Sequence, residues 1–168
     1  MRVLTQRLLL VALAGVLLSS TAAAQRRASG QSARPSLGPQ VGFATSNFDF
    51  FIGAQFSYPV ASQFDIYPSF VIFFPGNNVT AWALNADVRY WPRLNTPNPG
   101  LYLGGGLNVT HASVSVPGVG SASASDAGLG LLGGWEFKAV QVRPFAQLRI
   151  VIGDADRIEF GGGINFRL

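Results

Sequence analysis

The chain has 168 residues, a formal net charge of +4 and no cysteine. This length allows one domain with terminal segments, and the lack of cysteine excludes disulfides and a lipoprotein anchor. Five of the twelve basic residues precede Gln40, which leaves seven basic and eight acidic residues from Gln40 onward. The folded part is therefore nearly neutral, and nucleic-acid binding, which needs a basic surface, is disfavoured.

Residues 1–24 have the features of a secretory signal peptide. Arg2 and Arg7 precede an 11-residue apolar run over residues 8–18, which is shorter than a membrane-spanning helix requires. Small residues then lead to Ala24, so we expect cleavage between Ala24 and Gln25. The following segment, residues 25–36 ("QRRASGQSARPS"), has little apolar content and predicts a flexible linker.

From residue 37 apolar and polar residues alternate along the sequence with a period of two. In "WALNADVRY", residues 82–90, one parity is apolar and the other is mostly polar, which predicts a strand with two different faces. Turn-rich segments separate eight such stretches, and no stretch after residue 30 has a helical stripe. Pro68 removes a backbone donor inside the third stretch and predicts a bulge or a late strand start there. The predicted strands cover residues 37–46, 49–58, 64–74, 79–91, 101–112, 127–138, 142–152 and 157–168.

A possible dinucleotide-binding motif lies in "AGLGLLGGWEF", residues 127–137, where Gly128, Gly130 and Gly133 spell G-x-G-x-x-G. Such a fingerprint needs a helix that starts within it, but the residues that follow keep alternating up to Pro144. Gly128, Gly130 and Gly134 share one parity, and we interpret these glycines as small residues on the crowded face of a strand.

The two parities predict which face of the barrel meets lipid. No charged residue falls on the apolar parity of any predicted strand, as a lipid-facing surface requires, since one arginine or lysine at the bilayer midplane costs ~2–4 kcal/mol. We therefore predict an all-β, eight-stranded antiparallel up-and-down transmembrane β-barrel over residues 37–168. A soluble barrel with the apolar face inside is the alternative. The predicted polar network of the lumen comprises Asp65, Asp87, Arg89, Glu136, Lys138, Arg143, Arg149, Glu159 and Arg167.

Aromatic residues gather at the two ends of the predicted strands, as in the interfacial girdles of membrane barrels. One end of the barrel is assigned to the periplasm and the other to the outer surface. The predicted periplasmic girdle contains Tyr58, Phe64, Tyr90, Trp91, Tyr102, Trp135, Phe137 and Phe166, and the predicted outer girdle contains Phe43, Phe48, Phe50, Phe74 and Trp82.

The stretches "VRPFAQLRI", "YLGGGLNV", "GLGLLGGWEF" and "FGGGINFRL" resemble the small outer-membrane β-barrel superfamily, the OmpA/OmpX-like barrels. The resemblance implies location in the outer membrane of a Gram-negative bacterium, with lipid and lipopolysaccharide as surroundings. It also implies that Gly163, Phe166 and Leu168 in the last strand form the signal read by the barrel-assembly machinery. The final residue is Leu where the family usually has Phe.

One constellation has the composition of an acyl-transfer site. His111 and Ser113 share a strand face, and Asp126 begins the next predicted strand. The spacing is similar to that of lipid A deacylase barrels, although Val114 stands where those enzymes have Asn and the acid is Asp instead of Glu. The preferred interpretation is a polar strand end that enters a loop over residues 111–126.

The sequence predicts a non-enzymatic outer-membrane barrel that is a monomer and has a structural or surface-contact role. We expect no cofactor, because one histidine and no cysteine give no metal-ligand cluster, and no nucleic-acid partner. A narrow, porin-like pore is the first alternative, although eight strands leave an interior filled by side chains. A deacylase that uses His111, Ser113 and Asp126 is the second.

Overall fold

The computed structural model describes residues 34–45, 49–76, 79–94, 100–116, 120–137, 141–154 and 156–168. The predicted signal peptide, its cleavage site at Ala24 and Gln25, and most of the linker lie outside these residues. Lys138 of the predicted lumen network and Phe48 of the predicted outer girdle lie outside them as well. Within the described residues, no helix is long and apolar enough to cross a membrane.

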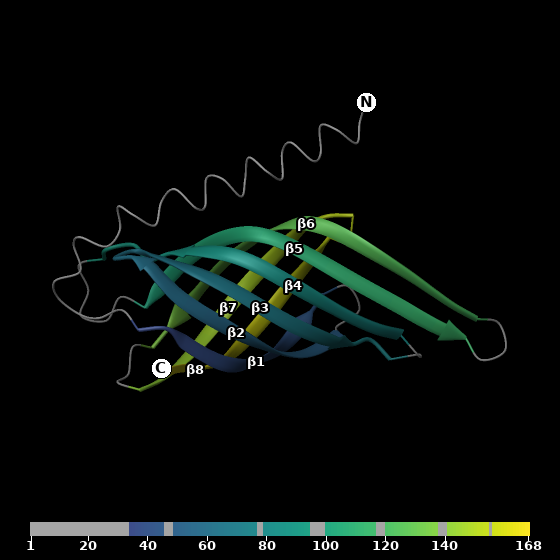
Figure 1. Cartoon of the computed structure of the whole chain (residues 1–168), viewed down its shortest axis with the longest axis horizontal. Coiled ribbons are helices and arrows are strands. Elements are labelled where there is room, and N and C mark those ends of the chain that lie inside the picture. Colours follow the sequence, from purple (N-terminus) through teal and green to yellow (C-terminus); the bar gives the residue numbers. More distant parts are fainter. Residues whose placement is uncertain are drawn as a thin grey trace, which may run out of the picture. The chain divides into compact units, whose positions relative to one another are not determined.

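The described chain forms a closed antiparallel β-barrel, as predicted (Figure 1). Each strand pairs with the next one in sequence, and β1 pairs with β8 through contacts such as Leu37↔Phe166, which closes the barrel. The strands are β1 (Ser36–Ala44), β2 (Asp49–Ala61), β3 (Phe64–Phe74), β4 (Val79–Tyr90), β5 (Leu101–Val116), β6 (Gly120–Glu136), β7 (Val142–Gly153) and β8 (Arg157–Arg167).

Alternation along each strand sorts the side chains into an interior and an exterior set. In β1, buried and exposed residues alternate without exception, because successive side chains of a strand point to opposite faces. The exterior set is apolar, with large side chains such as Phe43, Leu107 and Phe160 all more than half exposed. Phe51, Phe73, Leu132, Phe145 and Val151, which the parity places inside, are buried. The prediction of the two faces is confirmed.

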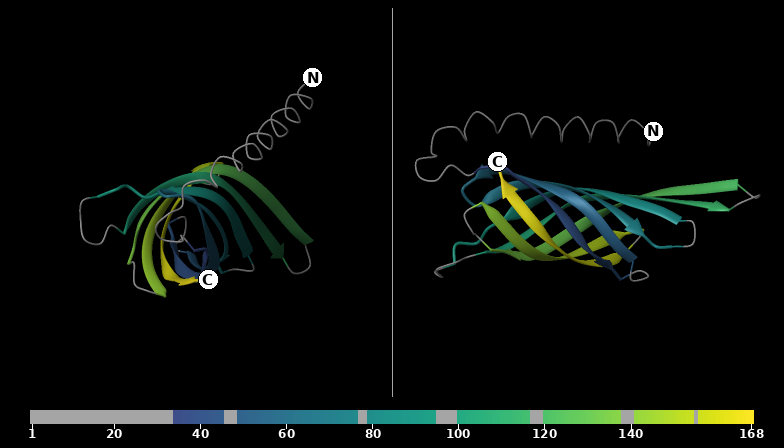
Figure 2. Two further views of the ribbon diagram at one scale, coloured as in Figure 1. Left: turned by 60° about the vertical axis from the view of Figure 1, so that its left-hand side comes forward. Right: turned by 90° about the horizontal axis from the view of Figure 1, so that it is seen from below.

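The long segment over residues 111–126 is not a loop. β5 and β6 stay paired from Leu101↔Trp135 to Val116↔Gly120, so this segment is a β-hairpin that extends the barrel wall (Figure 2). Its small Ser and Ala residues lack the hydrophobic alternation that reveals a strand in sequence. β5 and β6 pair with each other here, whereas β6 pairs with β7 only from Gly128↔Gly153 onward. We call this projecting segment the β5–β6 hairpin. The barrel end that carries it is the hairpin end, and the end where β1 starts and β8 stops is the terminal end.

Pro68 causes neither a late start of β3 nor a β-bulge in it. β3 begins at Phe64, and Pro68 pairs in register with Ala86 of β4. The pairs with β2 stop at Gln55↔Ser69 and resume at Tyr58↔Ile66 in the same register, and the irregularity of this pair of strands lies between Pro59 and Ala61. The prediction of a bulge at Pro68 was wrong. Pro68 lacks a backbone N–H, and the β2–β3 pairing is interrupted there without a change of register.

The glycines of the G-x-G-x-x-G stretch lie within β6 and make room for interior side chains. A Cβ on Gly130 would stand 2.9 Å from Nη1 of Arg149, and one on Gly134 would overlap the phenol of Tyr102. Gly133 points outward, where a Cβ would make an ordinary 3.4 Å contact with Leu103. The interpretation as small residues on a crowded face is confirmed for Gly130 and Gly134.

Candidate functional site: the charged interior of the barrel

The first group of interior charges lies toward the terminal end and is centred on Arg89. Its guanidinium donates from Nε and Nη2 to the two carboxylate oxygens of Asp65, at 2.9 and 2.7 Å. Ser57 and Trp91 also donate to that carboxylate, at 2.8 and 3.2 Å. On its other side, Nη1 of Arg89 lies 3.8 Å from Glu136. We call these residues, with Arg143, the Arg89 cluster.

Three aromatic rings surround the same guanidinium. The centroid of Tyr67 lies 3.8 Å from Cζ of Arg89, and the centroids of Tyr102 and Trp91 lie at 4.8 and 5.0 Å. Ring faces attract a cation, and most strongly where water is excluded. Tyr102 is fully buried, and the indole of Trp91 is directed to Asp65. Their assignment to the periplasmic girdle was therefore wrong, because both rings turn inward at the ends of their strands.

A second group of charges lies toward the hairpin end and is centred on Arg149. Its two Nη atoms donate to the two oxygens of Asp87, at 3.1 and 2.6 Å, and its Nε lies 3.6 Å from Glu159. Glu159 also accepts from Arg157 at 2.6 Å. We call these four residues the Arg149 cluster. The exposed fractions of the Asp87 and Arg149 side chains are 0% and 1%, so this pair is shielded from water.

Arg157 was missing from the predicted lumen network. It has the same parity as Glu159 and the other interior residues of β8, which is the signal that identifies it, but it stands at the first position of the strand. In the structure it is buried, donates to Thr110 at 2.9 Å and lies 5.2 Å from the ring centroid of Phe73.

Neutral polar side chains fill the interior beside the two clusters. One connected set contains Gln147, which donates to Gln40 at 3.1 Å and accepts from Tyr102 at 3.2 Å. Another runs from Asn108 to Asn85 at 2.6 Å and from Asn85 to Ser69 at 3.0 Å. These contacts satisfy buried polar groups that would otherwise be costly. Sequence parity marks all of them as interior, although the prediction named only charged residues.

The remaining predicted network residues lie at the terminal end. Arg143 is partly buried and donates to Glu136 at 3.2 Å, and Asn165 donates to the same carboxylate at 2.9 Å. Arg167 is exposed at the rim, and Arg34 and Arg143 are close enough to act on it electrostatically. The structure thus brings the other described network residues into the two clusters and leaves Arg167 at the mouth.

His111 and Ser113 share the outward face of β5, but Asp126 does not join them. It pairs with Thr110 and has the inward parity of β6. His111 instead contacts the hydroxyl of Ser125 through Nδ1 at 2.8 Å and stacks on Trp82, with ring centroids 5.3 Å apart. Asp126 and His111 therefore lie on opposite faces of the sheet, because a shift of one position along a strand moves a side chain to the other face.

The three residues of the predicted assembly signal lie on the last strand and just after it. Phe166 and Leu168 are exposed on the exterior, and Gly163 pairs with Gln40 of β1 and Phe145 of β7. No group of three or more His, Cys, Asp or Glu side chains suited to a metal occurs among the described residues.

An apolar exterior, a closed eight-stranded sheet and an interior of paired charges together define a small barrel of the outer-membrane type. Solved structures agree with this class. The chain is similar to the N-terminal β-barrel domain of OprF from Pseudomonas aeruginosa, with a TM-score of 0.62 and 16% identity over 79% of this chain and 97% of that one. Neisserial surface protein A gives a TM-score of 0.62 and 17% identity over 83% and 100% of the two chains. Ail, the attachment invasion locus protein of Yersinia pestis, gives 0.55 and 16% over 80% and 97%.

These TM-scores show a shared fold, the small closed β-barrel. No protein-family model and no curated protein sequence matches the chain.

Proposed function

We propose that this protein is an integral outer-membrane barrel with a structural or surface-contact role, without catalytic or conducting activity. The observation that carries the proposal is the separation of side chains by face: large apolar residues cover the exterior, and the charges within the barrel wall are paired inside. Hydrocarbon accepts such an exterior and requires every backbone group to be paired, as a closed barrel achieves. The fold shared with OprF, neisserial surface protein A and Ail supports the same location.

The paired interior supports a barrel that does not conduct. The Arg89 cluster, the Arg149 cluster and the neutral polar side chains beside them fill the interior, and these side chains are nearly all buried. A continuous water path through them would have to separate bidentate pairs such as Arg149–Asp87. We therefore expect no stepwise conductance in planar lipid bilayers, whereas a steady unit conductance would support the pore alternative.

The β5–β6 hairpin supports the surface-contact role. It projects beyond the other strands at the hairpin end (Figure 2) and presents an outward row of small polar residues, including Ser123 and Ser125. One Ail structure contains a heparin analogue, sucrose octasulfate. The hairpin end of this chain carries three acidic residues, Asp49, Asp154 and Asp156. These carboxylates would repel a sulfated polyanion, and we propose that the hairpin end contacts a partner whose surface is neutral or cationic.

The absence of an acid beside His111 supports a non-enzymatic role. Without an acidic partner, the imidazole lacks the group that orients and stabilises it during acyl transfer. We expect the substitution Ser113→Ala to leave the acylation pattern of lipid A in the host unchanged, as measured by mass spectrometry. A changed pattern would return the deacylase to consideration.

The terminal segments complete the proposal. Residues 1–24 act as a signal peptide cleaved between Ala24 and Gln25, residues 25–36 form a linker, and Gly163, Phe166 and Leu168 are recognised by the barrel-assembly machinery. Lipid and lipopolysaccharide surround the barrel, which functions as a monomer. Under this proposal the terminal end faces the periplasm.

The test of the location is a comparison of gel mobility for protein folded in detergent, unheated and boiled in SDS. A closed barrel keeps its sheet in cold SDS and migrates differently until it is heated. We expect a heat-dependent shift together with recovery of the protein in the outer-membrane fraction. A protein that stays soluble without detergent and shows no shift would contradict the proposal.

A further inference from the structure

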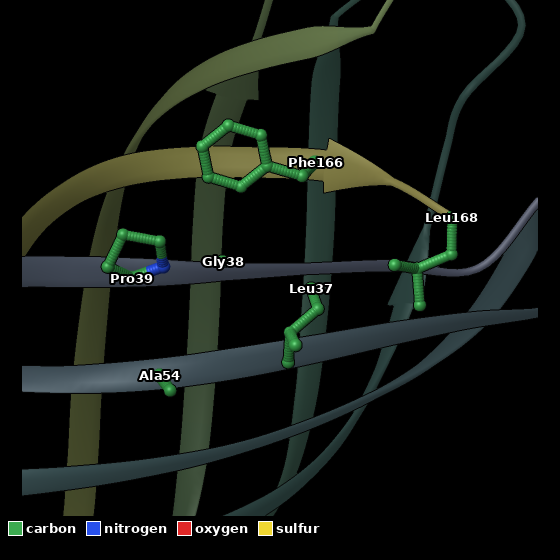
Figure 3. Close-up of a pocket in the computed structure, with 6 residues that line it drawn as sticks. All are labelled: Leu37, Gly38, Pro39, Ala54, Phe166 and Leu168. Carbon is green, nitrogen blue, oxygen red and sulfur yellow. The ribbon is translucent and has the colours of Figure 1, made fainter.

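An apolar hollow and an unpaired strand edge lie on the described surface of the barrel. The hollow is on the exterior at the terminal end (Figure 3) and is lined by Leu37, Gly38, Pro39, Ala54, Phe166 and Leu168. No polar side chain lines it, so under the proposed location it meets acyl chains like the rest of the exterior. The unpaired edge belongs to the β5–β6 hairpin, and there the backbone itself lacks a neighbour.

This edge is the side of β6 that faces away from β5, from Gly120 to Ala127. β6 pairs with β5 from Gly120 onward, but its pairing with β7 starts only at Gly128↔Gly153. No other described strand pairs with this part of β6. At ~3.4 Å per residue the edge is about 27 Å long, and its residues are exposed up to Ser125. We call this segment the β6 edge.

The edge is free because β7 ends early. The backbone N–H of Gly153 donates to the carboxylate of Asp156 at 2.7 Å, and this contact closes the turn from β7 into β8. A further strand on the β6 edge would therefore lie in line with β7 and begin where β7 ends.

The β6 edge lacks the features that usually protect a strand edge from pairing. Such edges commonly carry Pro, Lys or a β-bulge, but residues 120–127 ("GSASASDA") contain neither Pro nor Lys and stay in continuous register with β5. Ser and Ala alternate along it, so the hairpin has a hydroxyl-bearing outward face and an apolar inward face. Side chains of this size leave the backbone open to another strand.

Two carboxylates stand at the base of the β6 edge. Asp126 is half-buried near the end of the edge, Asp154 is exposed directly after β7, and both line one small hollow together with Thr110. Neither carboxylate has an ion-pair partner among the residues that the structure describes. They leave a negative charge at the base, which a lysine or arginine would neutralise.

We propose that the β6 edge binds an extended segment of another protein, which joins the sheet as an antiparallel strand in line with β7. The segment has alternating small apolar and polar side chains, and a basic residue at its amino-terminal end lies beside Asp126 and Asp154. In strand addition of this kind, main-chain hydrogen bonds give affinity and alternate side chains give specificity. Antiparallel pairing is the more stable arrangement per residue. The inference rests on the proposed surface-contact role and specifies its partner.

The experiment measures binding of the labelled peptide "KTVTVTVTV" to the full chain folded in detergent, by fluorescence anisotropy. We expect saturable binding, and binding several-fold weaker when Glu replaces the peptide's Lys. The double variant Asp126→Asn/Asp154→Asn should bind the two peptides equally. Asp49→Asn is the matched control, because Asp49 lies at the same end of the barrel but on β2, and this variant should keep the preference for Lys.

Methylation of single peptide nitrogens tests the strand pairing directly. Successive N–H groups of an extended segment point to opposite sides, so only alternate ones face the β6 edge. One peptide carries a methyl group on the nitrogen of its central Thr, and another carries it on the adjacent Val. We expect one of the two to bind at least several-fold more weakly and the other to bind like the unmodified peptide. Equal binding of the two would overturn the strand addition.

The outcomes separate this inference from the proposed function. The heat-dependent gel shift is measured first for each variant, and a wild type without a shift would contradict the membrane location itself. A wild type that shifts but binds no peptide would overturn the β6 edge as a docking site and leave the membrane barrel in place. A dimer that forms in detergent and excludes the peptide would also overturn it, because a second copy would then occupy the edge.

Discussion

Removing Asp87 should destabilise the barrel strongly, because it leaves Arg149 buried without its main partner. The Asp87 carboxylate accepts two hydrogen bonds from this guanidinium, and both side chains are almost fully shielded from water. A hydrogen bond to a charged group contributes ~1.5–3 kcal/mol, and breaking a buried pair costs ~3–5 kcal/mol. Since Glu159 remains 3.6 Å from Arg149, we expect Asp87→Ala to lower the free energy of unfolding by about 3 kcal/mol, at the low end of that range.

A double variant tests whether the loss of stability comes from the unpaired, buried charge of Arg149. Asp87→Ala/Arg149→Met removes both ions and replaces the guanidinium with an apolar side chain, and such replacements are often close to neutral. The double variant should therefore be more stable than either single variant, with a coupling energy of ~2–3 kcal/mol in the mutant cycle.

The assay is urea unfolding of the protein folded in detergent micelles, followed by tryptophan fluorescence and extrapolated linearly to water. Asp49→Asn at the hairpin end is the control and should change stability by less than ~0.5 kcal/mol. A loss below ~1 kcal/mol for Asp87→Ala, or a double variant less stable than both single variants, would refute this account of the interior.

Two further predictions use the same unfolding assay. Gly134→Ala places a methyl group against the phenol of Tyr102 and should cost ~1–3 kcal/mol through overpacking, whereas the outward Gly133→Ala should be nearly neutral; equal effects would contradict the assignment of faces. Leu131→Arg puts a charge on the exterior of β6 and should cost ~2–4 kcal/mol, while Ser123→Arg on the β5–β6 hairpin should be tolerated. If Leu131→Arg folds with unchanged stability, the exterior does not face hydrocarbon.

The sequence by itself determined the strand pattern and the direction of each face. In residues 82–90 the alternation sorts the side chains into two faces, since successive side chains of a strand point to opposite sides. The lack of charged residues on the apolar parity then indicated which face points outward. The same parity placed Asp87, Arg89, Arg149 and Glu159 inside. The inward glycines were also readable, because small residues on the polar parity of β6 indicate a crowded interior.

Tertiary structure decided where strands end and how they align. The β5–β6 hairpin has no hydrophobic alternation in its Ser- and Ala-rich part, and only pairing with the neighbouring strand makes it a strand. The inward direction of Trp91 and Tyr102, in contrast, follows from the alternation of the strands, because their neighbours Tyr90 and Leu103 point outward.

Partners inside the barrel depend on closure. Arg149 of β7 meets Asp87 of β4 although 62 positions separate them, and Arg89 lies between Asp65 and Glu136. Parity puts these residues in the interior, but the tilt and stagger of the strands determine which interior residues of distant strands lie at the same height in the barrel.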